Sequence, residues 1–441
     1  MGEAEQHAPT VLVVVGTRPE AIKMIPVIRA FQAAERITPV VISTGQHAEL
    51  VRQVLAVADI RADVELVSNP KGRSLNGLFA EVLAGLQRFV AERFGEPIVD
   101  AEWRAYEGYP VACFVHGDTT SAAAGALAAF HLHIPVAHVE AGLRTSDILS
   151  PYPEELNRQL ISRIASFHLA PTYRNEENLV REGVRHGKVF VTGNTAIDAL
   201  MWAAGLHVPY DAPELADLED DEETRVVVVT AHRRENWGAG ILQVGTAVRQ
   251  LAQRYPFVRF VVSLHPNPAV ADVLRGLLAF ETNVSLVQPM GYAAFARVLR
   301  RATIAITDSG GIQEEAPTLG TPVIVVRETT ERQEGVDAGT LELVGTDLDS
   351  IVAAASRLLD DEGERARRAA IVNPYGDGRA AERIVAACEY VAFDAEQPQA
   401  FGNGFNRLDI LRGAGYYNDP ARRVPVPSAA MLVGELSAED V

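Results

Sequence analysis

The chain has 441 residues, of which 48% are apolar and 22% charged, a composition typical of a globular protein with roughly two α/β domains. Its formal net charge of −18 argues against a nucleic-acid-binding surface, which would need basic patches. No apolar run approaches the roughly 18 residues of a membrane span, and the first residues lack the basic and apolar regions of a signal peptide. Two cysteines, Cys113 and Cys388, lie in apolar surroundings, so we expect buried thiols in a cytoplasmic protein.

Apolar, β-branched runs alternate with helical patterns through the first half of the chain. We expect buried strands at 11–15, 40–43, 111–115 and 135–139, and helices at 21–33 and 121–130. This alternation predicts a parallel, doubly wound sheet, which binds ligands at the carboxyl ends of its strands. Polar motifs follow these strands one after another, which favours a functional cleft at that edge.

A second series of strands and helices follows an acidic segment, 210–224, that we interpret as an exposed connection. Its expected strands are 226–230, 259–263, 284–286, 303–307 and 323–326. The sequence therefore predicts two Rossmann-like halves with a catalytic cleft between them. Residues 95–109 have the composition of a surface insertion, and the chain beyond 395 is a Gly/Pro/Asn-rich extension.

The segment 308–322, DSGGIQEEAPTLGTP, joins two of these strands through a turn and a short helix. Gly310 and Gly311 allow close approach of the backbone to a ligand, and the helix start favours a phosphate. Glu314 and Glu315, one turn later, could accept hydrogen bonds from ribose hydroxyls. The alternative is an ordinary turn between a strand and a helix.

Basic residues follow the first strand. Arg18 and Lys23 lie at its end, and the planar guanidinium of Arg18 suits a phosphate or a carboxylate. Because Arg18 precedes Pro19, we expect it in extended backbone. Solvated charges at a helix start are the alternative.

Acidic residues follow the later strands. His116 and Asp118 follow one strand, Glu140 follows the next, and Glu154 opens a helix on which Arg158 is placed to pair with it. Crowded carboxylates have raised pKa values, suited to acid and base catalysis, unless they share protons or face cations. Stabilisation of a helix start is the alternative role for each of them.

His232, followed by Arg233 and Arg234, is a candidate contact for an anion or a pyrophosphate, or else a structural hydrogen bonder. The string from Gly376 to Ala381 does not follow a strand, so it is not a dinucleotide-binding fingerprint. The sequence has no P-loop and no zinc-ligand spacing. We therefore expect catalysis by carboxylates, a histidine and cations, with no cofactor and no metal.

The motifs GTRPEAIKM, VHGDTT, HVEAGLRT, SPYPEELNRQ, TGNTAIDAL, TAHRREN, TDSGGIQEEAP and NPYGDG, spread over about residues 9–392, resemble those of the non-hydrolysing UDP-N-acetylglucosamine 2-epimerases. The resemblance implies a GT-B fold of two Rossmann-like domains with the active site in the interdomain cleft. The N-terminal domain would be 9–194, completed by a crossing helix at 376–393. The UDP-binding domain would be 195–375, and 394–441 would be an extension.

The resemblance also implies a reaction. UDP-N-acetylglucosamine (UDP-GlcNAc) and UDP-N-acetylmannosamine (UDP-ManNAc) would interconvert through elimination of UDP to 2-acetamidoglucal and its re-addition, without a redox cofactor. The product would supply ManNAc units for cell-surface polysaccharide synthesis. A homodimer is expected on the same basis.

Residue roles follow from the matching positions. The catalytic positions are Asp118, Glu140, Glu154 and His232. The substrate and UDP contacts are Arg18, Lys23, Arg158, Phe295, Ser309, Gly310, Gly311 and Glu315. A second, activating UDP-GlcNAc site would use Gln46, Arg73, Arg233 and His265. Glu49 replaces a glutamine of that second site, and its charge would weaken the binding of a diphosphate there.

Four other assignments remain open. A relative that acts on UDP-2,3-diacetamido-glucuronic acid is disfavoured by the motif 16–20 and by the two prolines before Glu154. A retaining GT-B glycosyltransferase would share the nucleotide segment but would have little use for the carboxylates. A hydrolysing epimerase usually carries a fused kinase domain. A non-catalytic sugar-nucleotide sensor would not need the carboxylates intact.

Overall fold

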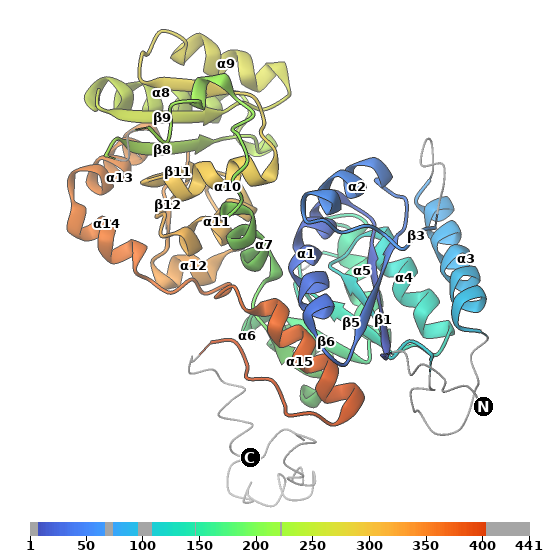
Figure 1. Ribbon diagram of the computed structural model, residues 1–441. Helices are drawn as coiled ribbons and strands as arrows, with labels where there is room; N and C mark the ends of the chain where they lie inside the picture. Colours follow the sequence, from blue (N-terminus) through green and yellow to red (C-terminus); the bar gives the residue numbers. More distant parts are fainter. Residues whose placement is uncertain (1–7, 67–73, 96–107, 146, 221–222, 403–441) are drawn as a thin grey trace, which may run out of the picture. The chain divides into compact units, whose positions relative to one another are not determined.

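The computed structural model describes residues 8–66, 74–95, 108–145, 147–220 and 223–402. The chain divides into two compact units (Figure 1). The first unit comprises residues 1–195 and 378–441, and the second comprises residues 196–377. Both consist of a parallel β-sheet with helices on its faces, so the predicted fold class is confirmed.

A seven-stranded parallel sheet forms the centre of the first unit, with the strand order β3-β2-β1-β4-β5-β6-β7. Its strands are β1 (Thr10–Val15), β2 (Thr38–Ser43), β3 (Val64–Glu65), β4 (Ala112–His116), β5 (Val136–Val139), β6 (Phe167–Ala170) and β7 (Val189–Val191). The strand order reverses between β1 and β4, where the crevice of a doubly wound sheet forms.

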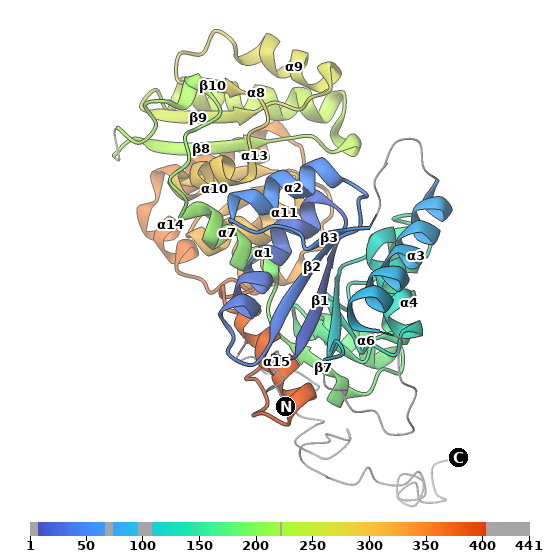
Figure 2. The ribbon, with the colours of Figure 1, turned by 45° about the vertical axis from the view of Figure 1, so that its right-hand side comes forward.

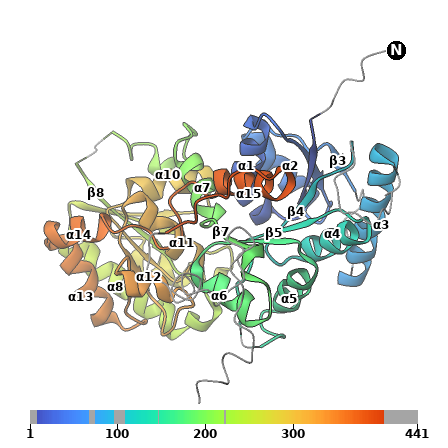
Figure 3. The same ribbon diagram turned by 90° about the horizontal axis from the view of Figure 1, so that it is seen from below.

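Seven helices of the described residues belong to this unit: α1 (Arg18–Ala33), α2 (Ala48–Val57), α3 (Leu75–Phe94), α4 (Thr120–His131), α5 (Glu154–Ile164), α6 (Tyr173–Arg181) and α15 (Ala380–Phe393). Figure 2 shows α3 and α4 on one side of the sheet and α1 on the other. The late helix α15 packs beside α1, as Figure 3 shows from below.

The start of α1 differs from the expectation that Arg18 is extended. Arg18 is the first helical residue, and the extended residue is Thr17, the N-cap. Thr17 and Glu20 form a capping box, and Pro19 is accommodated in the first turn, where its missing N–H is not needed. The cap therefore outweighs the preference of a residue before proline for extended backbone.

A six-stranded parallel sheet, in the order β10-β9-β8-β11-β12-β13, forms the centre of the second unit. Its strands are β8 (Arg225–Thr230), β9 (Val258–Ser263), β10 (Val284–Val287), β11 (Ile304–Thr307), β12 (Val323–Val325) and β13 (Leu341–Leu343). The helices are α7 (Thr195–Ala204), α8 (Ala239–Arg254), α9 (Pro268–Leu278), α10 (Tyr292–Arg301), α11 (Gly310–Glu315), α12 (Gln333–Ala338), α13 (Leu348–Asp360) and α14 (Glu362–Ala369).

Alternate residues of β8 pack into two cores. Val227 and Val229 contact the core on the side of α8, α9 and α13, whereas Val226 and Val228 contact the core on the side of α7 and α10. Both faces of this strand are buried, which explains its uninterrupted valine run.

Two expectations about connecting segments change. The acidic segment 210–224 is not simply exposed, because Leu215 and Leu218 are buried in the core of the second unit. Most of the segment 95–109 and all of 403–441 lie outside the described residues.

The C-terminal extension begins at residue 394 and is described as far as residue 402. Its residue Phe401 lies against β7, the edge strand of the first unit. The Phe401 N–H donates a hydrogen bond to the carbonyl of Val191 over 2.8 Å, and its ring is buried. The Arg383 guanidinium carbon lies 5.6 Å from the centre of that ring. Residues near 401 therefore cover the edge of the sheet.

Cys113 and Cys388 are both free and buried, as expected. Burial raises the pKa of each thiol to about 12. Among the residues that the structure describes, no helix combines the length and the apolar character that crossing a membrane requires.

Candidate active site

A cavity of about 240 Å³ lies in the first unit at the carboxyl ends of β1, β4 and β5. Five of the residues predicted from sequence line it: Lys23, His116, Asp118, Glu140 and Arg158. They come from four elements or their adjoining turns, and the parallel sheet brings them to one edge.

Glu140 is the centre of a cluster on one side of this cavity. Lys23 Nζ lies 2.9 and 2.7 Å from its two carboxylate oxygens, and His116 Nε2 lies 2.8 Å from Oε2. Burial alone would raise the pKa of the Glu140 carboxyl, but the nearby Lys23 and His116 outweigh it and hold that pKa well below its usual range. Glu140 therefore meets the condition stated for an unraised pKa, because it faces the cation Lys23.

Glu140 also adopts an uncommon backbone conformation. Its φ of +62° lies in the left-handed region, which non-glycine residues rarely occupy and which costs on the order of 1 kcal/mol. The turn after β5 therefore places this carboxylate at a conformational cost, which the ion pair with Lys23 and the contact with His116 offset.

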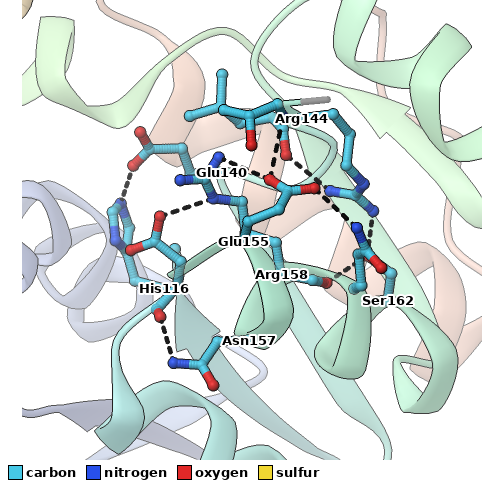
Figure 4. Close-up of polar contacts among 12 residues, drawn as sticks. His116, Glu140, Arg144, Glu155, Asn157, Arg158 and Ser162 are labelled. Carbon is cyan, nitrogen blue, oxygen red and sulfur yellow. Dashed lines mark hydrogen bonds and ion pairs between the residues drawn. The ribbon is translucent and has the colours of Figure 1, made fainter. Parts of the chain in front are cut away.

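Asp118 is held from α5 by two neighbouring side chains (Figure 4). Arg158 Nε donates to its carboxylate over 2.8 Å, and Asn157 Nδ2 donates to its backbone carbonyl over 2.8 Å. The Arg158 side chain is only 7% exposed, so the pair is shielded from solvent on the arginine side. Asp118 itself keeps 27% of its side-chain surface exposed, which leaves it accessible to a ligand.

Glu154 and Glu155 begin α5 with opposite surroundings. Glu155 is fully buried, and Arg158 Nη1 lies 3.2 Å from its Oε2. Glu154 is half-buried, and within the described part of the chain no hydrogen bond or ion pair involves its carboxylate. The expected pairing of Glu154 with Arg158 is therefore wrong, since Arg158 contacts Asp118 and Glu155.

Two buried side chains that sequence reasoning did not select support the cavity. Glu20 accepts hydrogen bonds from the Gly16 and Thr17 N–H groups and from the Thr119 hydroxyl over 3.1, 2.6 and 2.6 Å. Burial raises the pKa of the Glu20 carboxyl, against the lowering effect of these hydrogen bonds. Its signal in the sequence was the capping-box spacing Thr-x-x-Glu.

His138 is the second of these. Its Nε2 lies 2.7 Å from the carbonyl of Gly117, the residue between His116 and Asp118, so this nitrogen carries the proton and donates. Burial lowers the pKa of His138 to about 4, and the ring is therefore neutral near pH 7. Nothing in the sequence distinguished it from an apolar residue of the strand.

In the second unit, Asp308 anchors the turn that carries His232. Its fully buried carboxylate accepts from the N–H groups of His232 and Arg233, both over 2.9 Å, and from Asn236 Nδ2 over 3.0 Å. His232 Nδ1 lies 3.2 Å from Asp308 Oδ1. Burial lowers the pKa of His232, as do Arg233 and His265, and Asp308 opposes them.

The predicted nucleotide segment starts directly after β11. Ser309 is the N-cap of α11, and its N–H donates to the Thr307 hydroxyl over 3.0 Å. A side chain at Gly310 would collide with the Arg332 guanidinium, because a Cβ there would lie 2.9 Å from its central carbon. This arginine, a cation beside the segment, was missed because it follows β12 by several residues of irregular loop.

The carboxylates of this segment already have protein partners. Arg332 Nε donates to Glu314 over 2.9 Å, and the Tyr292 hydroxyl donates to Glu315 over 3.3 Å. Phe295, on the same helix as Tyr292, is partly buried against the core. Gly311 has no atom of another residue closer than 3.9 Å to the position of a Cβ.

The candidates for a second ligand site lie in both units. In the first unit, Gln46 accepts from the Ser121 hydroxyl over 2.7 Å, and Glu49 pairs with Arg52 over 2.6 Å. In the second unit, the rings of His265 and His232 are stacked, with centres 6.2 Å apart. Arg233 adjoins His232, and Arg73 lies outside the described residues.

Comparisons with known proteins show which family the chain is related to. The family model for UDP-N-acetylglucosamine 2-epimerase matches residues 29–389. A UDP-N-acetylglucosamine 2-epimerase from Yersinia pestis is 42% identical over 381 residues, which cover 86% of this chain and 97% of the relative.

Solved structures give the same result. The structure of UDP-GlcNAc 2-epimerase from Neisseria meningitidis bound to UDP-GlcNAc has a TM-score of 0.75 and 39% identity, and covers 85% of this chain and 98% of its own. A Staphylococcus aureus protein solved with UDP has a TM-score of 0.73 and 36% identity, and covers 89% of this chain and 100% of its own. The extent and level of these matches place the chain in the UDP-N-acetylglucosamine 2-epimerase family.

Proposed function

We propose that the protein interconverts UDP-GlcNAc and UDP-ManNAc by inverting the configuration at C2 of the sugar. The proposal is supported by the family membership and by the Neisseria meningitidis relative, whose structure contains UDP-GlcNAc. The observation that carries it is the pairing of Lys23 with Glu140 and of Arg158 with Asp118 in one cavity.

The proposed reaction has two steps that balance. In the first, a carboxylate removes the C2 proton, the C1–O bond to the diphosphate breaks, and a C1–C2 double bond forms, giving 2-acetamidoglucal and UDP. In the second, a proton is added to the opposite face of C2 while a diphosphate oxygen bonds to C1 again. No electrons are gained or lost overall, so the reaction needs no redox cofactor.

The C2 proton is only weakly acidic. Its removal therefore needs assistance at C1, where the bond to the diphosphate oxygen breaks. Cations near the departing diphosphate would stabilise the charge that develops there. We assign this role to Arg18, Lys23 and His232, which come from the ends of β1 and β8.

Proton transfer is assigned to the carboxylates. Glu140, whose pKa is held low by Lys23 and His116, is ionised near neutral pH, which a proton acceptor requires, although the low pKa makes it a weak base. Asp118, Glu140 and Glu154 are the candidates for removing the C2 proton and for returning a proton to the opposite face, and Arg158 would hold Asp118 in place.

Binding of the UDP group is assigned to the second unit. The N–H groups around Ser309, Gly310 and Gly311 would donate to phosphate oxygens. Glu315 would accept from a ribose hydroxyl, and Phe295 would pack against the uracil or the ribose.

The wider setting of the reaction is also a proposal. Supply of ManNAc units for cell-surface polysaccharides, a homodimer and activation by a second UDP-GlcNAc all rest on the family resemblance. A cytoplasmic location rests on the composition of the chain.

Proton NMR of UDP-GlcNAc incubated with the protein in D2O, without NAD or added metal, tests the proposal. We expect UDP-ManNAc to appear and deuterium to enter C2 of both epimers. Release of free ManNAc would instead assign the protein to the hydrolysing branch. An unchanged spectrum, with binding of UDP-GlcNAc demonstrated separately, would reject the epimerase and leave a transferase or a sensor.

A further inference from the structure

We propose that Glu155 is a positioning residue, which acts on the reaction by aiming Arg158 at Asp118. This inference rests on the proposed function, in which Asp118 exchanges a proton with the substrate. Glu155 itself does not line the cavity, whereas Arg158 and Asp118 do. It therefore has no direct route to a ligand in that cavity and can act there only through its neighbours.

The first step of the argument is the burial of Glu155. Its side chain is 0% exposed, and a buried carboxylate is costly unless hydrogen bonds or opposite charges compensate for lost water. Its oxygens accept from three donors: the Thr145 N–H over 3.1 Å, Arg158 Nη1 over 3.2 Å and Gln159 Nε2 over 2.9 Å. All three partners are donors, so both carboxylate oxygens of Glu155 act as acceptors.

The second step is the geometry of Arg158. Its guanidinium is planar and rigid, so holding one nitrogen limits the directions in which the others point. Glu155 holds Nη1, and Nε then donates to Asp118 Oδ2 over 2.8 Å. Figure 4 shows Arg158 beside the carboxylate of Glu155.

The third step is the number of segments that meet at Glu155. Through Thr145 it binds the segment that follows β5, and through Arg158 it binds the turn that follows β4. A second arginine reinforces the same contact: Arg144 donates to Ser162, and Ser162 donates to the backbone carbonyl of Arg158. The positioning of Asp118 therefore depends on a buried polar network anchored on α5.

The substitution Glu155→Gln isolates this role. All partners of Glu155 are donors, so the NH2 group of a glutamine must face one of them, and only Gln159 could accept from it, by turning its amide. The charge that opposes Arg158 is lost as well. We expect kcat to fall roughly 10- to 100-fold, since small misplacements of reacting groups have effects of this size. We expect KM to change less than about threefold, because Glu155 contacts no substrate.

A matched control is available in the same unit. Glu176 is also 0% exposed and lies 2.7 Å from His186, away from the cavity. Glu176→Gln should destabilise the protein as another buried carboxylate would, while leaving kcat unchanged. A fall in kcat of equal size in both variants would overturn the proposal, because the effect would then be a general loss of structure.

Two further measurements separate positioning from support of the fold. In the Arg158→Lys background, Glu155→Gln should have little additional effect on kcat, and additive losses would contradict action through Arg158. Glu155→Asp keeps the charge but shortens the reach, so we expect a reduced kcat. If Glu155→Gln does not fold, wild-type activity of Glu155→Asp would reject the proposal.

The last measurement needs no turnover, so failure of the proposed function is distinguishable from failure of this inference. The Nε–H signal of Arg158, labelled with 15N and assigned by its loss in Arg158→Lys, reports the contact with Asp118. We expect this signal to shift and broaden in Glu155→Gln and to be unchanged in Glu176→Gln. An unchanged Arg158 signal in Glu155→Gln would overturn the inference, whether or not the wild-type protein epimerises UDP-GlcNAc.

Discussion

Asp118 and Glu140 lie in one cavity, and each has a cation of its own: Arg158 for Asp118 and Lys23 for Glu140. Each carboxylate is therefore stable as an anion while remaining near a ligand-sized space. Replacing one member of either pair should therefore change a measurable property of the protein.

Replacing Asp118 tests its proposed part in proton transfer. Asp118→Asn keeps the size of the side chain and removes the ability to exchange a proton, so we expect kcat to fall by about 10² to 10⁴ with little change in KM. The rate of deuterium incorporation at C2 in D2O measures this directly.

The matched control is Asp272→Asn. The Asp272 side chain is 68% exposed, and among the described residues it forms an ion pair only with Arg275. The variant should retain wild-type activity. Full deuterium exchange by Asp118→Asn would remove this residue from the mechanism.

Replacing Lys23 tests how much its ion pair with Glu140 contributes to the free energy of unfolding. Because the pKa of folded Glu140 is depressed, its contribution to stability is present above the unfolded pKa of about 4.3 and is lost as the pH falls below it. We expect Lys23→Met to lower the free energy of unfolding by about 2 kcal/mol at pH 7, less than for a fully buried pair.

Urea unfolding at pH 7 and pH 4 provides the measurement, with a smaller difference between Lys23→Met and wild type expected at pH 4. Arg52→Met removes ion pairs with Glu49 and Glu65 at a side chain that is 63% exposed, and should cost less than about 1 kcal/mol at either pH. A difference in unfolding free energy between Lys23→Met and wild type that is larger at pH 4 than at pH 7 would contradict the expected pH dependence.

Sequence reasoning identified the residues at the strand ends and the cations Lys23 and Arg158, but not the buried side chains that support them. Asp118 and Glu140 follow apolar runs, and a parallel sheet gathers such positions at one edge. Glu155 was indistinguishable from Glu154 on the sequence, because which of two adjacent glutamates faces inward depends on how α5 packs. His138 was missed because a neutral buried histidine occupies a strand position as an apolar residue would.

At the scale of elements, α4 approaches the end of β1 so closely that only glycine fits between them. A Cβ at Gly16 would lie 2.3 Å from the Cβ and the hydroxyl oxygen of Ser121. This contact brings the turn carrying Arg18 toward the helix that follows Asp118.

We expect Gly16→Ala to destabilise the protein by about 1–3 kcal/mol, as overpacking of a core does. Gly276, inside α9, is the matched position, since a Cβ there would meet nothing within 4 Å. Gly276→Ala should stabilise the protein by about 0.5–1 kcal/mol through helix propensity. Thermal unfolding of both variants measures the two effects, and equal shifts in the same direction would show that space at Gly16 is not limiting.

The strength of the sequence signal decided which elements could be predicted. The buried strands β1, β4, β8 and β11 were found because largely apolar runs mark strands buried on both faces. β6 and β13 were missed because His168 and Glu342 interrupt their apolar runs, and β3 and β7, with two and three residues, were missed as well. The segment 210–224 was misjudged because its two buried leucines are outnumbered by acidic residues.

At the scale of the whole molecule, the described start of the C-terminal extension contributes to the fold of the first unit. Phe401 is buried and bonds to the edge strand β7, and Arg383 lies over its ring. The motifs that carry the family resemblance end at about residue 392, so this contact is a property that the resemblance did not predict.

Two truncated chains test this contact. A chain ending at Gly402 keeps this contact and is the reference. A chain ending at Phe393 should lose about 2 kcal/mol, the contribution of burying one phenylalanine, and should aggregate more readily through the uncovered β7. Urea unfolding and light scattering measure these outcomes, and equal behaviour of the two truncated chains would show that Phe401 contributes nothing.

The return of the chain to its first unit has a consequence for biosynthesis. The second unit is one continuous segment, complete once Asp377 has been made, whereas the first unit needs α15, which packs on α1 and emerges only afterwards. Domains usually complete folding in the order of their synthesis. Here the order is reversed, because the second unit is complete before the first. The N-terminal sheet leaves the ribosome while the face of α1 that packs on α15 is still uncovered. A nascent chain that stalls shortly before Ala380 therefore exposes this face, and we expect it to be the state that most requires a chaperone.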